Sequence, residues 1–80
     1  MTPSELVSRE IIRLARATQR SAYISTTRLS AFYNLPEKSV RQELANLAGA
    51  NRIRLAGWPS NEEFVASAQD VTGVRVLLLE

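Results

Sequence analysis

The sequence predicts an α+β fold, in which three helices and a small antiparallel sheet follow one another in the order α-β-α-α-β-β. Residues 3–19 and 36–48 carry apolar side chains at the three- and four-residue spacing of amphipathic helices. Residues 52–56 alternate polar and apolar, as a half-buried strand does, and residues 74–79 form an apolar, β-prone run. The chain has 80 residues, of which 45% are hydrophobic and 22% charged. This size and composition indicate one globular domain, expected over residues 1–80.

The first helix is expected over residues 3–19. Thr2 is placed to cap it, Pro3 suits the first helical position, and Glu5 lies at the positive end of the helix dipole. One face is apolar: Val7, Ile11, Leu14 and Thr18. The opposite face carries four arginines: Arg9, Arg13, Arg16 and Arg20. We interpret this arginine stripe mainly as a solvated face, except that Arg20 lies near the second helix and within possible reach of phosphate.

A short strand at residues 23–25 and two further helices are expected next. A helix capped by Thr26 or Thr27 ends at Asn34, because asparagine tolerates positive φ better than most residues. Pro36 opens the third helix. The inward stripe of that helix is Val40, Leu44 and Leu47.

The strand at residues 52–56 is followed by a long connection. Trp58 is interpreted as a lid over the core, and Asn61 as the cap of a short helical turn. The acidic residues of the connection are Glu62, Glu63 and Asp70. This acidity indicates a segment that folds back on the domain or meets a protein. The final strand, residues 74–79, is apolar enough to be buried on both faces or against a partner.

Residues 29–44 have the spacing of a helix-turn-helix motif. Two short helices that cross steeply need a small residue at the crossing, which Ser30 supplies, and a turn with positive φ, where Asn34 stands. Apolar anchors must point inward from both helices. The residues at the expected offsets are Leu29, Tyr33, Leu35, Val40 and Leu44.

On these residues, the stretch 21–79 resembles a winged helix-turn-helix domain. The run Val40-Arg41-x-x-Leu44-x-x-Leu47, followed by Asn51-Arg52-Ile53, resembles the third helix and first wing strand of bacterial transcription regulators, the GntR type among them. The resemblance implies that the third helix lies in the DNA major groove. It also implies that Arg41 touches the operator and that three neighbours approach DNA: Lys38, Ser39 and Gln42.

The residues of the third helix support the same interpretation independently. At 100° per residue, Lys38, Gln42 and Ala45 lie opposite the apolar stripe, with Arg41 and Asn46 beside them. Lysine and arginine can bond guanine, glutamine and asparagine can bond adenine, and the small alanine would allow close approach to base edges. The alternative is an ordinary solvated face, on which Glu37 and Arg41, four residues apart, form an ion pair.

Further cations are candidate phosphate contacts. Arg28 lies near the start of the second helix, and Arg52, Arg54 and Arg75 are expected to share one face if the two strands pair. The strand arginines serve equally well as charges that protect a sheet edge. Residues 1–58 carry nine basic and four acidic side chains, whereas residues 59–80 carry one basic and four acidic. This distribution favours a polyanion on the N-terminal part.

Composition excludes several classes of function. The sequence has no cysteine and no histidine, which removes nearly all zinc sites and the common nucleophile–base triads. We therefore expect no enzyme, no cofactor and no metal. The longest apolar run, residues 76–79, is too short to cross a membrane, so a cytoplasmic protein is expected.

Two functions remain open on the sequence. The first is a DNA-binding module, a transcription regulator whose partner is double-stranded DNA. The second is a winged helix used for protein–protein contact, with a homodimer or protein partner meeting the first helix, the final strand or Phe32. Phe32 is expected either to mark that contact or to pack with Phe64 beneath the long connection.

Overall fold

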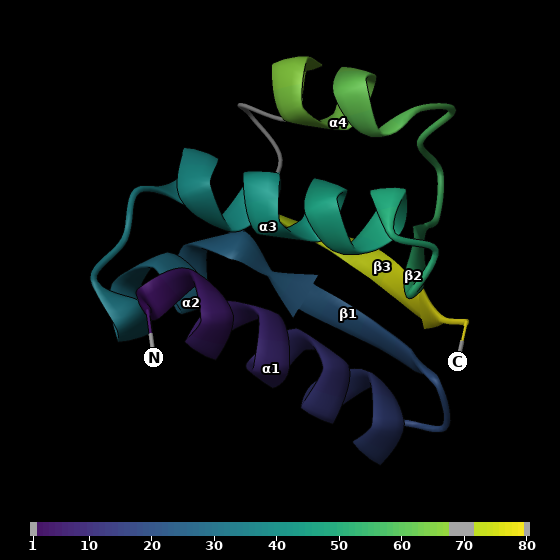
Figure 1. Ribbon diagram of the computed structural model, residues 1–80, viewed down its shortest axis with the longest axis horizontal. Coiled ribbons are helices and arrows are strands. Elements are labelled where there is room, and N and C mark those ends of the chain that lie inside the picture. The colour runs from purple at the N-terminus through teal and green to yellow at the C-terminus, as the bar shows by residue number, and fades with distance from the viewer. Residues whose placement is uncertain (1, 68–71, 80) are drawn as a thin grey trace.

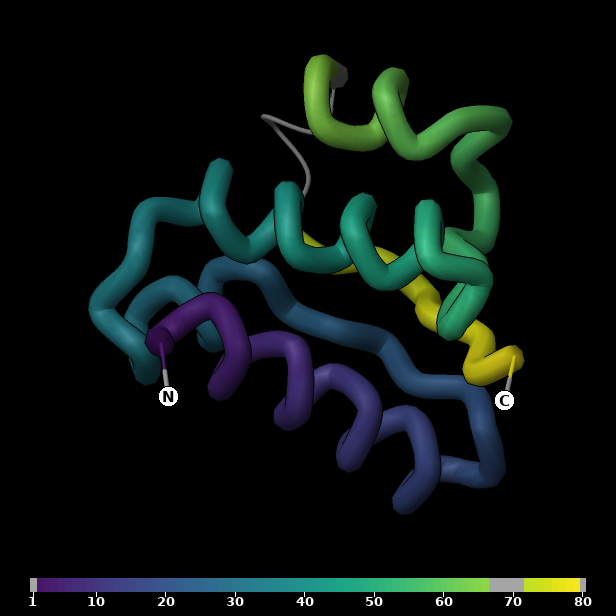
Figure 2. Tube along the Cα trace, viewed as in Figure 1, coloured from purple at the N-terminus to yellow at the C-terminus, as the bar shows by residue number. Residues whose placement is uncertain are grey.

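The computed structural model describes residues 2–67 and 72–79, and its sheet is flanked by helices on one side (Figures 1 and 2). The described elements run in the order α1 (Pro3–Ala17), β1 (Ser21–Ser25), α2 (Thr26–Tyr33), α3 (Glu37–Gly49), β2 (Ile53–Leu55), α4 (Asn61–Ser67) and β3 (Gly73–Leu78). The predicted α+β class is confirmed. The difference from the predicted order is α4, which stands where the sequence indicated only a short helical turn. The sequence of residues 70–73 is typical of a turn; residues 70 and 71 lie outside the described residues, and Gly73 already belongs to β3.

The starts of the helices follow from side-chain caps. Thr2 Oγ1 accepts from Glu5 N at 3.3 Å, as predicted. The cap of α2 is Ser25, whose Oγ accepts from Arg28 N at 3.2 Å, rather than Thr26 or Thr27. Ser25 takes this role because it is the last residue of β1 and still has extended backbone, which a cap requires.

The ends of α1, α2 and α3 share one geometry. In each, a residue with positive φ is followed by a backbone N–H that donates to the carbonyl five residues earlier. The residues with positive φ are Gln19 (60°), Asn34 (54°) and Asn51 (60°). The bonds are Arg20 N to Ala15 O at 2.8 Å, Leu35 N to Ser30 O at 3.0 Å and Arg52 N to Leu47 O at 3.0 Å. The left-handed turn predicted at Asn34 is confirmed, and α1 stops two residues earlier than expected because Gln19 leaves the helix.

The sheet has strand order β1-β3-β2, and both pairings are antiparallel. In β3, Val74, Val76 and Leu78 are buried, while Arg75 is exposed and Leu77 is half-buried. Burial of this strand on both faces within the domain, one of the expectations, is therefore wrong. The reason is that the described helices that contact the sheet lie on one side of it (Figure 2).

The outer face of the sheet is partly covered by its own aromatic residue. Tyr23 of β1 leans across Gly73 of β3, so closely that a Cβ on that glycine would stand 2.6 Å from Tyr23 Cε1. Any larger residue at position 73 would have to displace the ring.

The core lies between the sheet, α1 and α3. The inward stripe predicted for α3 is confirmed, because Val40, Leu44 and Leu47 are all buried. In α1, Val7 and Ile11 are fully buried as expected. The remaining core residues are Ile12, Ala15, Ala22, Ile24, Leu29, Ile53, Leu55, Phe64, Val74, Val76 and Leu78.

The connection after β2 folds back on the domain through α4, which is one of the two arrangements expected from its acidic residues. Of those acidic residues, Asp70 lies outside the described part of the chain. The cap of α4 is Ser60, whose Oγ accepts from Glu63 N at 3.1 Å, and not Asn61. Phe64 is buried and meets Trp58 edge to face, with ring centroids 5.3 Å apart. Trp58 packs against the core cluster, which confirms its interpretation as a lid. Helix α4 consequently lies along α3, on the side away from α1 (Figure 1).

Candidate functional site

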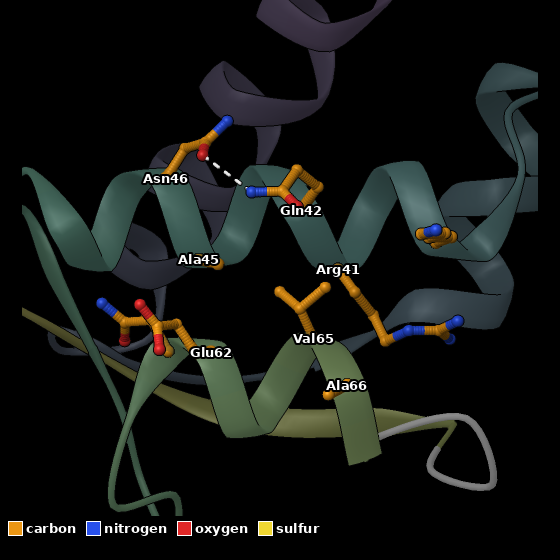
Figure 3. Close-up of a pocket in the computed structure, with 9 residues that line it drawn as sticks. Arg41, Gln42, Ala45, Asn46, Glu62, Val65 and Ala66 are labelled. Atoms are coloured by element: carbon orange, nitrogen blue, oxygen red, sulfur yellow. Dashed lines mark hydrogen bonds between the residues drawn. The ribbon is translucent and has the colours of Figure 1, made fainter.

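The third helix exposes a polar strip with a spacing of four residues. Lys38, Gln42 and Asn46 are exposed, as expected from the helical period. Gln42 Nε2 donates to Asn46 Oδ1 at 3.0 Å (Figure 3). Asn46 Nδ2 donates to Glu43 Oε1 at 3.5 Å. The two amides are therefore held in one orientation along the helix.

The orientation of this strip is fixed by the turn before it. Ser30 Oγ donates to Leu35 O, and Leu35 N donates back to Ser30 O. This double link joins α2 to the start of α3 across Asn34. Ser30, which the sequence predicted as a small residue between the helices, therefore links the end of α2 to the turn before α3.

A groove runs between α3 and α4 (Figure 3). Its volume is about 780 Å³. On α3 it is lined by Lys38, Arg41, Gln42, Ala45 and Asn46, and on α4 by Asn61, Glu62, Val65 and Ala66. The cations belong to one wall, and the carboxylate belongs to the other.

Arg41 is buried, and the expectation that it is exposed is wrong. Only 9% of its side chain is accessible. Its Nη1 lies 3.6 Å from Glu37 Oε2, so the ion pair proposed from the sequence exists but lies beyond hydrogen-bond distance. Arg41 Nε and Nη1 are buried and have no hydrogen-bond partner in the structure. The cause is α4, which packs on α3 and places Val65 and Ala66 in the same groove (Figure 3).

Ala45 is also covered, with 7% of its surface exposed. The sequence interpretation gave this small residue the task of letting the helix approach base edges, and that placement is wrong. The same small size lets α4 pack closely against α3. The signal that could have located the cover is the run Ser60 to Val65, in which a capping serine precedes an apolar pair.

The other predicted residues are distributed over separate surfaces. Ser39 is half-buried in the first turn of α3, and Arg28 is exposed in the first turn of α2. Arg54 and Arg75 are exposed on the outer face of the sheet, whereas Arg52 precedes β2. The structure therefore brings Lys38 and Gln42 together with Arg41 beneath them. It does not join them to Arg28, Arg52 and Arg54 in one groove.

A second groove, of about 550 Å³, is rich in aromatic side chains whose proximity was not predicted from the sequence. Phe32 is 79% exposed and Tyr23 59% exposed. Phe32 meets Tyr33 edge to face at 4.9 Å. Its expected packing with Phe64 is wrong, because Phe64 is buried beside Trp58 instead. The residues lining the groove are Glu10, Arg13, Leu14, Tyr23, Ser25, Arg28, Leu29, Phe32 and Tyr33.

An ion pair borders this aromatic groove. Arg13 donates through Nε to Glu10 Oε2 at 3.1 Å and through Nη2 to Glu10 Oε1. These hydrogen bonds lower the pKa of Glu10 and raise the pKa of Arg13. The Glu10 carboxylate is thus paired with Arg13 of the same helix, and Arg28 brings a further positive charge to the groove.

Within residues 2–67 and 72–79, no helix has the length and apolar character needed to cross a membrane. The same residues contain no cluster of three or more carboxylates that could hold a metal ion. Comparison of the chain with protein-family models, with curated proteins and with solved structures finds no match.

Proposed function

We propose that the protein is a winged-helix DNA-binding module that contacts duplex DNA through the exposed strip Lys38, Gln42 and Asn46 of α3. The observation that carries this proposal is the combination of that strip with the fixed turn before it. A helix that reads a major groove must present polar side chains at a defined angle. The proposal implies a non-enzymatic regulator of transcription that acts in the cytoplasm.

The chemistry of the strip suits base recognition. A lysine donates to guanine O6 and N7 or to a phosphate, and an amide side chain pairs with adenine N6 and N7. The hydrogen bond between Gln42 and Asn46 restricts the rotation of both side chains. Less conformational entropy is therefore lost when they bind DNA.

Helix α4 determines from which side DNA approaches. It flanks α3 and carries Glu62 and Glu63 in its first turn. The major groove is about 12 Å wide and admits one helix, not a packed pair. Phosphates are repelled by the carboxylates of α4, so the duplex is expected to lie over Lys38 and Gln42 and away from α4. Arg41 is beneath this surface and is not assigned a base contact.

The test is fluorescence anisotropy of a labelled mixed-sequence duplex at about 50 and 200 mM salt. We expect binding that weakens with salt. Lys38→Gln should lower the slope of log K against log salt by about 1. The matched control is Arg54→Gln, which removes the same charge from the outer face of the sheet and should leave the slope unchanged. An absence of binding at low salt, or equal effects of the two variants, contradicts the proposal.

A second candidate function is protein contact, favoured by Phe32. Phe32 is 79% exposed and lines the same groove as the exposed Tyr23, and exposed apolar patches mark contact sites. A second copy of the chain would cover both rings. Sedimentation equilibrium should then show a dimer that Phe32→Ser dissolves, with Leu6→Ser on α1 as the matched control. A monomer at all concentrations up to about 1 mM, near −4 kcal/mol of association, contradicts this function.

A further inference from the structure

Arg41 is a buried cation whose hydrogen-bonding capacity is not met. A guanidinium carries five N–H donors, and burial of these groups without partners is unfavourable. Glu37 neutralises part of the charge from 3.6 Å, but it makes no hydrogen bond to Arg41 at that distance. Nε and Nη1 both remain buried without an acceptor. Both atoms are covered in this structure, so an oxygen acceptor reaches them only when the side chains over Arg41 move aside.

The surroundings of Arg41 are cationic and form one end of the groove. Its guanidinium extends toward the first turn of α3, since Glu37 lies one turn earlier. Lys38 is three residues before Arg41 and lines the same groove. The positive end of the helix dipole points in this direction too, and the cap residue Pro36 offers no side-chain acceptor.

The rest of the groove has a different character. Ala45, Val65 and Ala66 supply an apolar surface beyond Arg41, and Glu62 lies at the other end, below Ala45 (Figure 3). The volume of about 780 Å³ is that of a small-molecule site. A ligand that fits has an anionic group at one end, a compact body, and hydrogen-bond donors facing Glu62.

We propose that the α3–α4 groove binds a small phosphorylated molecule, whose phosphate oxygens accept from Lys38 and, once the side chains over Arg41 move aside, from Arg41 Nε and Nη1. A phosphate matches the fork of a guanidinium and bonds it in bidentate fashion. Glu37, which is partly exposed, is the resident counter-ion that the phosphate displaces. The inference does not rest on DNA binding. If DNA also binds over Lys38, the ligand and the duplex compete.

The alternative source of the same chemistry is a backbone phosphate of DNA. A free ligand and a duplex differ in one respect that can be measured. A free phosphate compound needs the groove alone, whereas a backbone phosphate reaches Arg41 only as part of a longer contact over α3.

The test is a titration followed by ¹H–¹⁵N NMR, with inorganic phosphate and pyrophosphate as probes and chloride balancing the ionic strength. We expect saturable shifts of the Arg41 Nε–H signal and of the amides of residues 37–42 and 65–66. Pyrophosphate should bind more tightly than phosphate. Glu37→Gln removes the competing carboxylate and should tighten pyrophosphate binding by about threefold to tenfold.

Three further variants test the role of Arg41. Arg41→Met should abolish the saturable shifts, and Lys38→Met should weaken binding by about threefold or more. Arg54→Met is the matched control on the outer sheet face and should bind as the unmodified protein does. If Arg41→Met does not fold, the opposite effects expected from Glu37→Gln and Lys38→Met still test the proposal.

The outcomes separate the two proposals for α3. Shifts that do not saturate in either the unmodified protein or Glu37→Gln overturn the phosphate site, as does an equal loss in Arg54→Met. If a short duplex moves the Arg41 signal and pyrophosphate does not, the phosphate belongs to DNA and the free-ligand site is wrong. If pyrophosphate saturates and no duplex binds, the phosphate site stands and the DNA-binding proposal is wrong.

Discussion

The two buried sides of α3 differ in how they are covered. The side facing α1 and the sheet is buried through Val40, Leu44 and Leu47, which are apolar and spaced at helical period. The side facing α4 is buried through Arg41 and Ala45, which show no such pattern. A regular apolar stripe reports a face that must leave water. An alanine and an arginine, whose long aliphatic stem can be buried or exposed, do not predict burial until the covering segment is known.

This difference has an energetic counterpart. Burial of the inner side removes apolar area from water, so it stabilises the domain. Burial of the outer side includes a guanidinium whose donors are not all satisfied, so it contributes less to the stability of the domain. The same helix therefore has one side that stabilises the domain and another that, in our proposal, binds a ligand.

The largest effect is expected from the inner side. Leu44→Ala removes a fully buried side chain and should lower the free energy of unfolding by about 3–5 kcal/mol, because the cavity cannot collapse fully. Urea denaturation followed by circular dichroism measures this. Gln42→Ala, an exposed change on the same helix, should alter stability by less than about 0.5 kcal/mol. A loss below about 1 kcal/mol for Leu44→Ala would remove the energetic distinction between the sides.

The outer side is expected to respond in the opposite direction. In phosphate-free chloride buffer, Arg41→Met should raise the free energy of unfolding by about 1–2 kcal/mol, because an apolar chain of similar length replaces a poorly satisfied buried charge. Glu37 is partly exposed and regains water when its partner is removed. Thermal and urea unfolding both measure this, with Arg54→Met as a neutral control. A clear destabilisation would mean that the cation supports the packing of α4.

A smaller effect distinguishes the ends of α1 and α3, which share a geometry but not a residue type. Gln19 and Asn51 both have φ of 60°. Gln19→Gly should stabilise the domain by about 0.5–1 kcal/mol, because glutamine is strained in this region. Asn51→Gly should change the free energy of unfolding by only roughly 0.3 kcal/mol, since asparagine tolerates the conformation. Thermal melts of both variants decide it, and an equal gain would show that strain is not the cause.

The smallest effect concerns the exposed counterpart of the Arg41–Glu37 pair, which is Arg13–Glu10 on α1. Arg13 lowers the pKa of Glu10, so the folded state favours the ionised carboxylate. The resulting stabilisation is present above the ordinary glutamate pKa of about 4.3 and is lost as pH falls through the lower folded pKa. Glu10→Gln should therefore be slightly less stable than the unmodified protein at pH 7 and equally stable at about pH 2–3.

The measurement for this pair is urea denaturation across that pH range. Solvent screens an exposed pair, so the gap at pH 7 is expected to be the smallest of the four effects. A gap that widens toward acid pH would contradict the assignment of the lowered pKa to Arg13.

Much of the fold could be predicted because it depends on local chemistry. Thr2 as a cap, Asn34 as a left-handed residue and the inward stripe of α3 each depend on a few neighbouring residues, and each is confirmed. The end of α1 was placed too late because glutamine gives no signal for a left-handed turn. The single-sided burial of β3 was missed because its outward Leu77, and Leu79 directly after the strand, look like core residues in the sequence.

The candidate site was less predictable because it depends on a distant segment. Lys38 and Gln42 are exposed as the helical period required. The burial of Arg41 depends on residues 61–66, about twenty positions further along, and on the anchoring of Phe64 beside Trp58. No periodicity within α3 contains that information.

The position of β3 in the sheet also affects when the domain can form. Strands β1 and β2 each pair with β3, and the register joins residues 21–25 to residues 73–77. During synthesis, the helices can form early, but the sheet pairings described here must wait until residues 73–78 have left the ribosome. Such long-range closure slows folding compared with an all-helical domain of the same size. Until then the apolar faces of α1 and α3 are open to other chains, which makes the nascent protein a candidate client of chaperones.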